Sequence, residues 1–131
     1  MEIFKDFKFE AALPLHGLPE GHKCARLHGH SYRVRVVVAG VPDPARGWVV
    51  DYADIKAAVQ PVIERLDHSF LNEIEGLERS TTENLAMWLW RSIRRGVPGL
   101  CRLEVWETAT SGVIYRGEHE PGEGSGRGGS R

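Results

Sequence analysis

The chain has 131 residues, and its 17 Lys and Arg nearly balance its 18 Asp and Glu, for a net charge of −1. This length is typical of one domain, and the absence of a basic or acidic run excludes the electrostatic pattern of a nucleic-acid-binding protein. No apolar stretch approaches the roughly 20 residues that span a bilayer, the N-terminus lacks a signal peptide's apolar run, and Cys24 and Cys101 lie far apart, so we expect a cytoplasmic protein without disulfides or membrane contact.

The first 40 residues predict two β-strands that form a hairpin. Phenylalanines alternate with charged residues, so residues 7–11 fit a strand with one buried face. Prolines and glycines recur in residues 14–27 and predict a loop. In residues 29–40, a tyrosine and valines share one face while arginines occupy the other, which predicts a second strand. The order strand, loop, strand predicts a long antiparallel hairpin.

Two amphipathic helices are predicted in the middle of the chain. Asp51 can cap a helix whose apolar residues recur with helical spacing as far as Leu66. Pro61 lies inside this pattern, so we expect a kink or a break near it. Residues 69–79 read as an irregular connection. Residues 80–83 have the Ser-Thr-Thr-Glu spacing of a capping box, which predicts the start of the second helix.

The last part of the domain returns to strands. Alternation over 101–109 and again over 113–116 predicts two strands, so the order is ββααββ. This order predicts an α+β fold with an antiparallel sheet and two helices on one face. We expect residues 1–118 to form the domain and residues 119–131, rich in Gly, Glu, Ser and Arg, to be a disordered tail. Sheet edges that close against other subunits would protect the remaining surface.

A metal and thiol site is suggested between Glu20 and His30, which enclose three of the six histidines and one of the two cysteines. His28 and His30 are two residues apart, and on an extended chain such side chains lie on the same face, where they can bind one metal ion. Cys24 lies in the loop, and a thiol beside a metal or cation can act as a base or nucleophile. An isolated His-x-His pair is a weak signal, so the interpretation depends on support from elsewhere in the chain.

Two further groups supply candidates for chemistry. Asp67 and His68 follow the first helix, and a carboxylate beside an imidazole fixes its tautomer and favours proton relay. The alternative is a surface pair that caps the helix. Glu107 lies in an otherwise apolar strand, where a carboxylate can accept two adjacent N–H donors from a planar heterocycle. The alternative is a solvent-facing position with Glu104 as its companion.

Taken together, these motifs resemble the 6-pyruvoyl-tetrahydropterin synthase family, which includes the bacterial 6-carboxy-5,6,7,8-tetrahydropterin synthases of queuosine biosynthesis. The resemblance covers residues 3 to about 118, and the motifs that carry it are Cys24-x-x-x-His28-Gly-His30, Gly47-Trp48-x-x-Asp51, Leu66-Asp67-His68, Thr81-x-Glu83-Asn84 and Glu107-Thr108. The loop form Glu20-Gly-His-Lys-Cys24 is more similar to the queuosine branch. The resemblance implies the tunnelling fold (T-fold), in which ββααββ subunits form a trimeric barrel and two barrels stack as a hexamer, with active sites between subunits.

The resemblance also implies residue roles. Cys24 would be the general base, and Asp67 with His68 would relay protons from a neighbouring subunit. Glu107 would anchor the pterin ring. His28 and His30 would bind Zn²⁺.

One departure from the family pattern concerns the metal. The family's third zinc ligand is a histidine at the position of Leu13 in this chain. A catalytic zinc normally has three protein ligands and one open position, so two histidines alone would hold it weakly. His16, three residues further on, is the candidate replacement. The other outcomes are a two-histidine site completed by water or substrate, a different metal, or no metal.

The implied substrate is 7,8-dihydroneopterin triphosphate, a small-molecule pterin. In the queuosine-type reaction it becomes 6-carboxytetrahydropterin with release of acetaldehyde and triphosphate. The first alternative is the pyruvoyl-type reaction, which eliminates triphosphate from the same substrate. The second is a pterin-binding paralogue with an impaired metal site and no catalysis, and the third is a metal-storing or regulatory module that binds no pterin.

Overall fold

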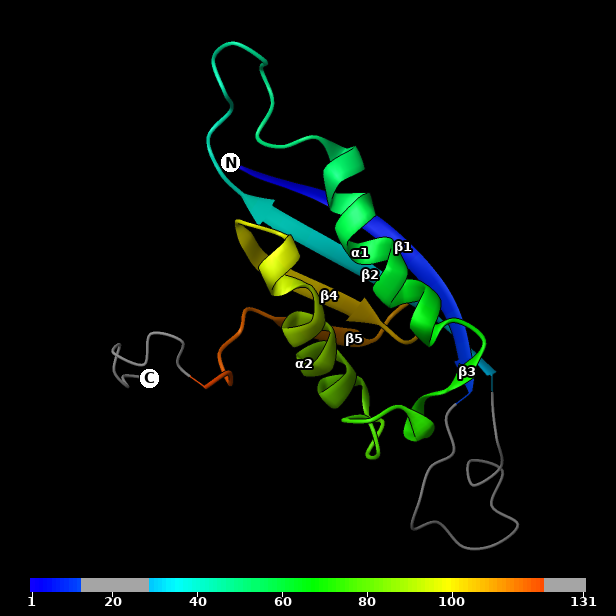
Figure 1. The fold of residues 1–131 in the computed structure, drawn as a ribbon. Helices are drawn as coiled ribbons and strands as arrows, with labels where there is room; N and C mark the ends of the chain where they lie inside the picture. The colour runs from blue at the N-terminus through cyan, green and yellow to red at the C-terminus, as the bar shows by residue number, and fades with distance from the viewer. Residues whose placement is uncertain (13–28, 122–131) are drawn as a thin grey trace, which may run out of the picture.

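The computed structural model describes residues 1–12 and 29–121. In Figure 1 they form a curved sheet with two helices packed across it. The elements, in chain order, are β1 Glu2–Ala12, β2 Gly29–Ala39, α1 Tyr52–Leu66, β3 Ser69–Phe70, a 3₁₀ turn Leu71–Glu73, α2 Thr82–Ile93, a second 3₁₀ turn Arg94–Gly96, β4 Leu100–Trp106 and β5 Gly112–Tyr115. None of the helices in these residues is long and apolar enough to cross a membrane.

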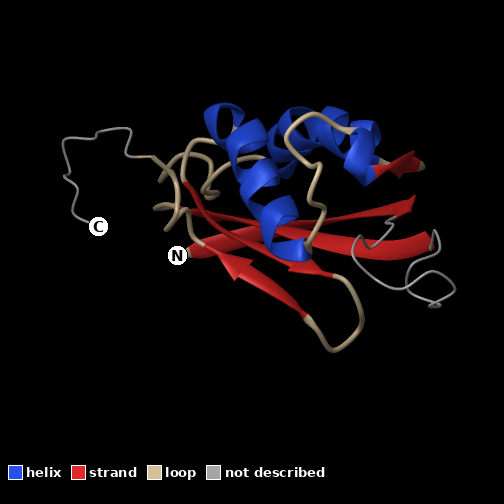
Figure 2. Cartoon of the chain, turned by 90° about the horizontal axis from the view of Figure 1, so that it is seen from below, coloured by secondary structure: helices blue, strands red, loops and turns tan. Residues whose placement is uncertain are grey.

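The sheet confirms the predicted hairpin and fold class. Its strand order is β3-β1-β2-β4-β5, and β1 pairs antiparallel with β2 along its whole length, from Glu2 opposite Ala39 to Ala12 opposite Gly29. β2 with β4 and β4 with β5 are also antiparallel. Figure 2 shows both helices on the same side of the sheet. The structure has one strand that was not predicted: β3, which has two residues, pairs parallel with β1 in a stretch predicted to be irregular.

The core lies between the helices and the sheet because each strand turns alternate side chains toward them. On β2, the predicted face of one tyrosine and three valines is buried, with Tyr32 at 2% exposure. Its ring stacks on Phe9 of β1 with centroids 4.9 Å apart. α1 contributes Ile55, Val59, Ile63 and Leu66 to the same core.

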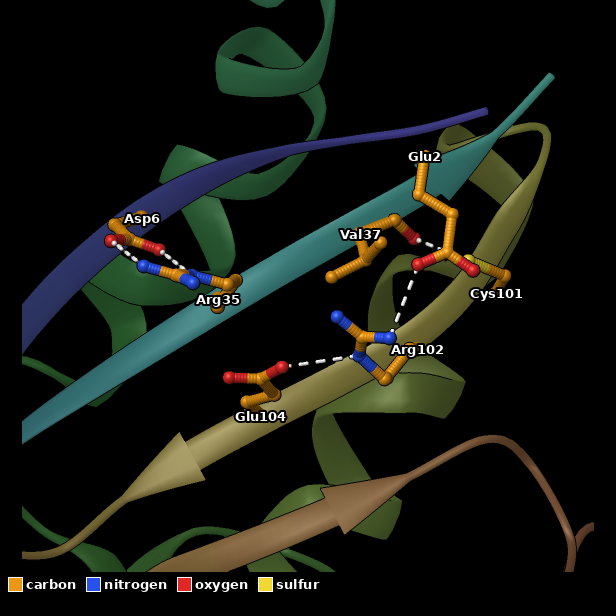
Figure 3. A network of polar contacts seen from close by, with 7 residues as sticks. All are labelled: Glu2, Asp6, Arg35, Val37, Cys101, Arg102 and Glu104. Carbon is orange, nitrogen blue, oxygen red and sulfur yellow. Dashed lines mark hydrogen bonds and ion pairs between the residues drawn. The ribbon is translucent and has the colours of Figure 1, made fainter. Parts of the chain in front are cut away.

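The opposite face of the sheet carries ion pairs instead of a second core (Figure 3). Arg35 of β2 forms a two-bond contact with Asp6 of β1, at 2.8 and 3.0 Å, and this contact holds the pKa of the Asp6 carboxyl below its usual value. Arg102 of β4 contacts Glu2 and Glu104, each at 3.1 Å. Two cross-strand pairs and one pair within β4 therefore neutralise these charges on a face that no helix covers.

Two details of the helices differ from the prediction. Of the kink or break expected at Pro61, the break is wrong, since α1 is a single helix through it. Proline removes one backbone donor there, and the apolar contacts of α1 with the sheet outweigh that loss. The cap of α2 is Thr81, not Ser80: the Thr81 hydroxyl accepts from the backbone N–H of Asn84 at 3.1 Å. Ser80 is buried and donates to the carbonyl of Leu77 instead. The predicted cap of α1 is confirmed, because Asp51 accepts from Ala53.

The chain continues past β5 in close contact with α2. Gly117 has a φ of +78°, and a β-carbon there would lie 2.6 Å from the Trp90 ring. Glu120 then accepts from the Tyr115 hydroxyl at 2.5 Å and from Arg91 at 2.8 Å. Residue 120 lies beyond the domain boundary predicted at 118. That boundary stays a prediction, and residues 122–131 lie outside the described residues.

Candidate active site

One end of the sheet, where β1 ends beside β3 and β2 begins (lower right in Figure 1), concerns most of the described candidate residues. Near the end of β1, Ala11 is the register partner of His30 on β2 and of Ser69 on β3. On the other side of β2, Arg33 pairs with Trp106, the last residue of β4. The antiparallel hairpin therefore brings the start of β2 between the ends of β1 and β4.

This register has a direct consequence for the candidate site. His30 on β2, Asp67 with His68 just before β3, and Glu107 just after β4 come to the same end of the sheet. These residues lie up to 77 positions apart in the sequence. Within one chain they therefore lie at one end of the sheet, and the role of Asp67 and His68 in the site of a neighbouring subunit stays a prediction.

The Asp67–His68 pair both ends α1 and is tied to β1: Asp67 is the C-cap of the helix, and its backbone N–H donates to the Ile63 carbonyl at 2.9 Å. One Asp67 carboxylate oxygen, Oδ1, accepts from the Glu10 backbone N–H at 2.8 Å, and Oδ2 lies 3.2 Å from His68 Nδ1. The His68 N–H donates to the Glu10 carbonyl at 2.5 Å. The carboxylate therefore orients the imidazole, and His68 remains 80% exposed at its side chain. An imidazole held this way can exchange protons through its other nitrogen, Nε2.

Glu107 is partly buried next to the start of α2. The Thr82 hydroxyl donates to Glu107 Oε1 at 2.5 Å, and the Glu107 N–H donates to the Ser111 carbonyl at 3.1 Å. Glu104 is not its companion, since Glu104 pairs with Arg102 on the uncovered face. A carboxylate offers about four lone-pair sites, so the bond from Thr82 leaves capacity for two N–H donors of a ligand.

Tyr32 links the two parts of the site. Its ring lies under His30, with centroids 5.9 Å apart. Burial raises the pKa of the Tyr32 hydroxyl, and the charge of Glu107 raises it further. Tyr32 therefore stays neutral, and its buried side chain lies near both His30 and Glu107.

The predicted metal and thiol residues fall mostly outside the described part of the chain. His16, Cys24 and His28 lie in residues 13–28, which the structure does not describe. Within residues 1–12 and 29–121, no group of three or more His, Cys, Asp or Glu side chains could hold a metal. His30 contributes an imidazole, the donor that zinc accepts, and His28 stands two positions before it in the sequence. A zinc site thus depends on ligands from residues 13–28.

Sequence reasoning did not identify Thr82 as the partner of Glu107 or Glu10 as the backbone support of Asp67. Thr82 belongs to a helix-start motif that was recognised for its local capping pattern alone. Its partner lies 25 positions away, and that of Asp67 lies 57 away, so neither pairing leaves a local signal.

An α+β subunit with two helices across one face of a five-stranded sheet agrees with the tunnelling fold expected from the sequence. The solved structure of 6-pyruvoyl tetrahydropterin synthase from Caenorhabditis elegans superposes with a TM-score of 0.80 at 27% identity, over 89% of this chain and 95% of that one. Residues 2–118 match the sequence model of the family described as 6-pyruvoyl tetrahydropterin synthase. The chain belongs to the 6-pyruvoyl tetrahydropterin synthase family.

Curated relatives in this family carry different activities. The 6-carboxy-5,6,7,8-tetrahydropterin synthase of Synechocystis is 46% identical over 121 residues, covering 86% of this chain and 91% of that protein. The dihydroneopterin monophosphate aldolase of Pyrococcus furiosus is 41% identical over 90 residues, 66% of this chain and 75% of the relative. Human 6-pyruvoyl tetrahydrobiopterin synthase is 38% identical over 97 residues, 70% of this chain and 67% of the relative.

Proposed function

We propose that this chain is a lyase of the 6-carboxy-5,6,7,8-tetrahydropterin synthase type. It would convert 7,8-dihydroneopterin triphosphate to 6-carboxytetrahydropterin, with release of acetaldehyde and triphosphate, in queuosine biosynthesis. The observation that carries this is a pair of supported carboxylates: Glu107, bonded to Thr82, as the pterin anchor, and Asp67, beside His68, as part of the relay that a subunit would contribute to its neighbour's site. The 46% identity to the Synechocystis synthase favours this reaction over the pyruvoyl type.

Each residue has a physical role in this proposal. Glu107 accepts hydrogen bonds from the amino-pyrimidine edge of the pterin, a planar group with adjacent N–H donors. Cys24, as a thiolate, takes or returns a proton at the substrate side chain. His68 completes the proton transfer through Nε2, while Asp67 holds Nδ1. Binding and proton transfer therefore use separate carboxylates.

We propose Zn²⁺ as the cofactor, with His28, His30 and His16 as its ligands. When bound, zinc supplies a Lewis acid that lowers the pKa of the substrate's side-chain hydroxyls. His16 is included because Leu13, at the family's third ligand position, has an apolar side chain. Sequence spacing and resemblance support this ligand set.

We also propose a homo-oligomer, a hexamer built as a dimer of trimers, in the cytoplasm. Among the described residues, β3 pairs only with Ala11 and Ala12 of β1, so most of the outer edge of β1 has no neighbouring strand. β5 forms the other end of the sheet. Exposed strand edges of this kind favour pairing with another chain. A second subunit at the site would also shield the exposed His68 imidazole.

The test is turnover of 7,8-dihydroneopterin triphosphate by the purified protein, with products separated and identified by mass. We expect 6-carboxytetrahydropterin together with acetaldehyde. A 6-pyruvoyl product without acetaldehyde would assign the chain to the pyruvoyl reaction. Pterin binding without turnover would leave a non-catalytic paralogue.

Cysteine variants test the assignment of the base. We expect Cys24→Ala to lose turnover and to keep pterin binding. Cys101→Ala is the matched control, because the Cys101 thiol donates to the Val37 carbonyl at the far end of β4 and should keep both properties. Full activity of Cys24→Ala would refute the base assignment.

Elemental analysis tests the metal. We expect stoichiometric zinc in the purified protein and its loss in His16→Ala. His119→Ala is the control, because His119 stacks on Tyr115, away from the sheet end described above. Stoichiometric zinc that survives the His16 change would refute the replacement ligand. No zinc together with no turnover would favour the non-catalytic alternative.

A further inference from the structure

The turn between α1 and β3 holds His68 in an unusual backbone conformation. His68 has a φ of +58°, and it is the single non-glycine residue with positive φ in the described part of the chain. A β-carbon disfavours this left-handed region, although histidine tolerates it better than most residues. Such a conformation persists where the surrounding structure enforces it. The contacts of this turn therefore decide where the imidazole lies.

On the helix side, a serine hydroxyl closes the turn. Ser69 Oγ donates to the carbonyl of Leu66 at 2.6 Å, in a partly buried bond. Leu66 is the last residue of α1, and its carbonyl is one of the last four, which lack intrahelical partners. The bond thus spans Asp67 and His68 and joins the two residues that flank them.

On the sheet side, the same turn is fixed to β1. The Glu10 backbone binds both the Asp67 carboxylate and the His68 N–H. Ser69 itself pairs with Ala11. Two sets of bonds therefore clamp the turn, one from the strand backbone and one from the Ser69 hydroxyl. The Ser69 hydroxyl bond can be removed by substituting a side chain outside the Asp67–His68 pair, whereas the strand backbone bonds cannot.

The imidazole has little other support. The His68 side chain is 80% exposed in the single chain, so no packing within its own subunit fixes its direction, and its contact with Asp67 depends on the turn geometry. If the Leu66 carbonyl lost its donor, His68 could relax toward negative φ, and its β-carbon would swing away from the present position. The relay would then be misplaced without loss of the fold.

We propose that Ser69 is a positioning residue for His68. The proposal rests on the proposed function, in which His68 relays the proton. The Ser69 hydroxyl acts through the Leu66 carbonyl and sets the backbone of the turn. It contributes to the proton-transfer step and not to pterin binding, which uses Glu107 at the end of β4.

Three variants test the kinetic consequence. Ser69→Ala removes the hydroxyl, and we expect kcat to fall about fivefold or more, the size expected for one lost hydrogen bond, with KM unchanged. Ser69→Thr keeps an oxygen donor at a strand position that favours β-branched residues and should restore kcat. Ser92→Ala is the matched control, because Ser92 Oγ makes the same kind of bond to the Trp88 carbonyl, at 2.8 Å on α2, and kcat should not change.

Amide hydrogen exchange measures the turn without turnover. In Ser69→Ala, the peptide that contains His68 should exchange at least fivefold faster than in the wild type, while Ser69→Thr and Ser92→Ala should match the wild type there. Unchanged exchange in Ser69→Ala would overturn the proposal, as would faster exchange with unchanged kcat. If the wild-type protein does not turn over the pterin triphosphate, the proposed function fails and the positioning role fails with it, even where exchange shows that Ser69 fixes the turn.

Discussion

Replacing Asp67 by asparagine separates two tasks of one carboxylate. Oδ1 accepts from the Glu10 N–H at 2.8 Å, and Oδ2 lies 3.2 Å from His68 Nδ1. Asparagine keeps an acceptor for Glu10 but turns an amide NH₂ group toward His68. Nδ1 must then accept a hydrogen bond, so the ring proton moves to Nε2 and the imidazole has the wrong tautomer for accepting a proton there.

The two effects differ in size. A positioned general acid–base group contributes roughly 10²- to 10⁴-fold, so Asp67→Asn should lower kcat by about that factor, or about 3–5 kcal/mol in activation free energy. The free energy of unfolding should change by about 1 kcal/mol or less, because the bond to Glu10 survives. Asp67→Ala also removes that bond. Its additional cost is at the lower end of about 1–3 kcal/mol, because the Asp67 side chain is 35% exposed and water can reach the N–H.

Steady-state kinetics with the pterin triphosphate and urea denaturation measure both effects. Asp6→Asn is the matched control, because it removes the same charge from the Arg35 pair on the uncovered face and should leave kcat unchanged. A kcat of Asp67→Asn within a few-fold of the wild type would refute the orienting role of Oδ2. Equal destabilisation by asparagine and alanine would refute the role of Oδ1.

Three further predictions concern contacts around the site and the C-terminal segment. Thr82→Val removes the donor to Glu107, and we expect pterin affinity to fall by more than about tenfold in calorimetric titration, as the ~1.5–3 kcal/mol of a charge-assisted bond implies, while Thr82→Ser should retain it. Gly117→Ala places a β-carbon 2.6 Å from Trp90 at positive φ, so thermal unfolding should show a loss of about 1–3 kcal/mol, and unchanged stability would contradict the contact. Burial and the bond to Glu120 raise the pKa of Tyr115 to about 12, above the value near 10 of an unfolded chain. The folded state therefore holds this proton more tightly, so the protonated Tyr115 hydroxyl stabilises the fold fully below pH about 10. This contribution to the free energy of unfolding should be lost as the pH rises toward about 12. Tyr115→Phe should lose less stability than the wild type over that pH range in unfolding experiments.

Much of the fold was predictable because its signals are local. The alternation in residues 29–40 predicts β2 and its buried face, since a strand with one covered face must alternate apolar and polar side chains. Asp51 was recognisable as a cap because its bond reaches only two residues along the chain. The break considered at Pro61 was wrong for the same reason, since local propensity says nothing of the apolar face that fixes α1 to the sheet. The strand β3 has two residues and exists only through its pairing with β1.

The candidate site was predictable in its residue types but not in its supports. Asp67 and His68 are adjacent, so their pairing could be inferred from the sequence alone. The donors that fix Asp67 and Glu107 come from β1 and α2, across 57 and 25 positions, and only the tertiary fold brings them together. The roles of residues 13–28 stay predictions, because the structure does not describe them.

The candidate site has one part held by hydrogen bonds of the fold and another part that the proposed metal would hold. Experiments can therefore separate the two parts. Glu107 and Asp67 are each held by a hydrogen bond from another element of the fold, so neither needs a metal to keep its place. The proposed zinc ligands other than His30 lie in residues 13–28, and the departure at Leu13 affects only that part. Chelation of zinc should therefore abolish turnover while pterin still binds through Glu107. Loss of pterin binding on chelation would mean that the metal also organises the Glu107 end of the site.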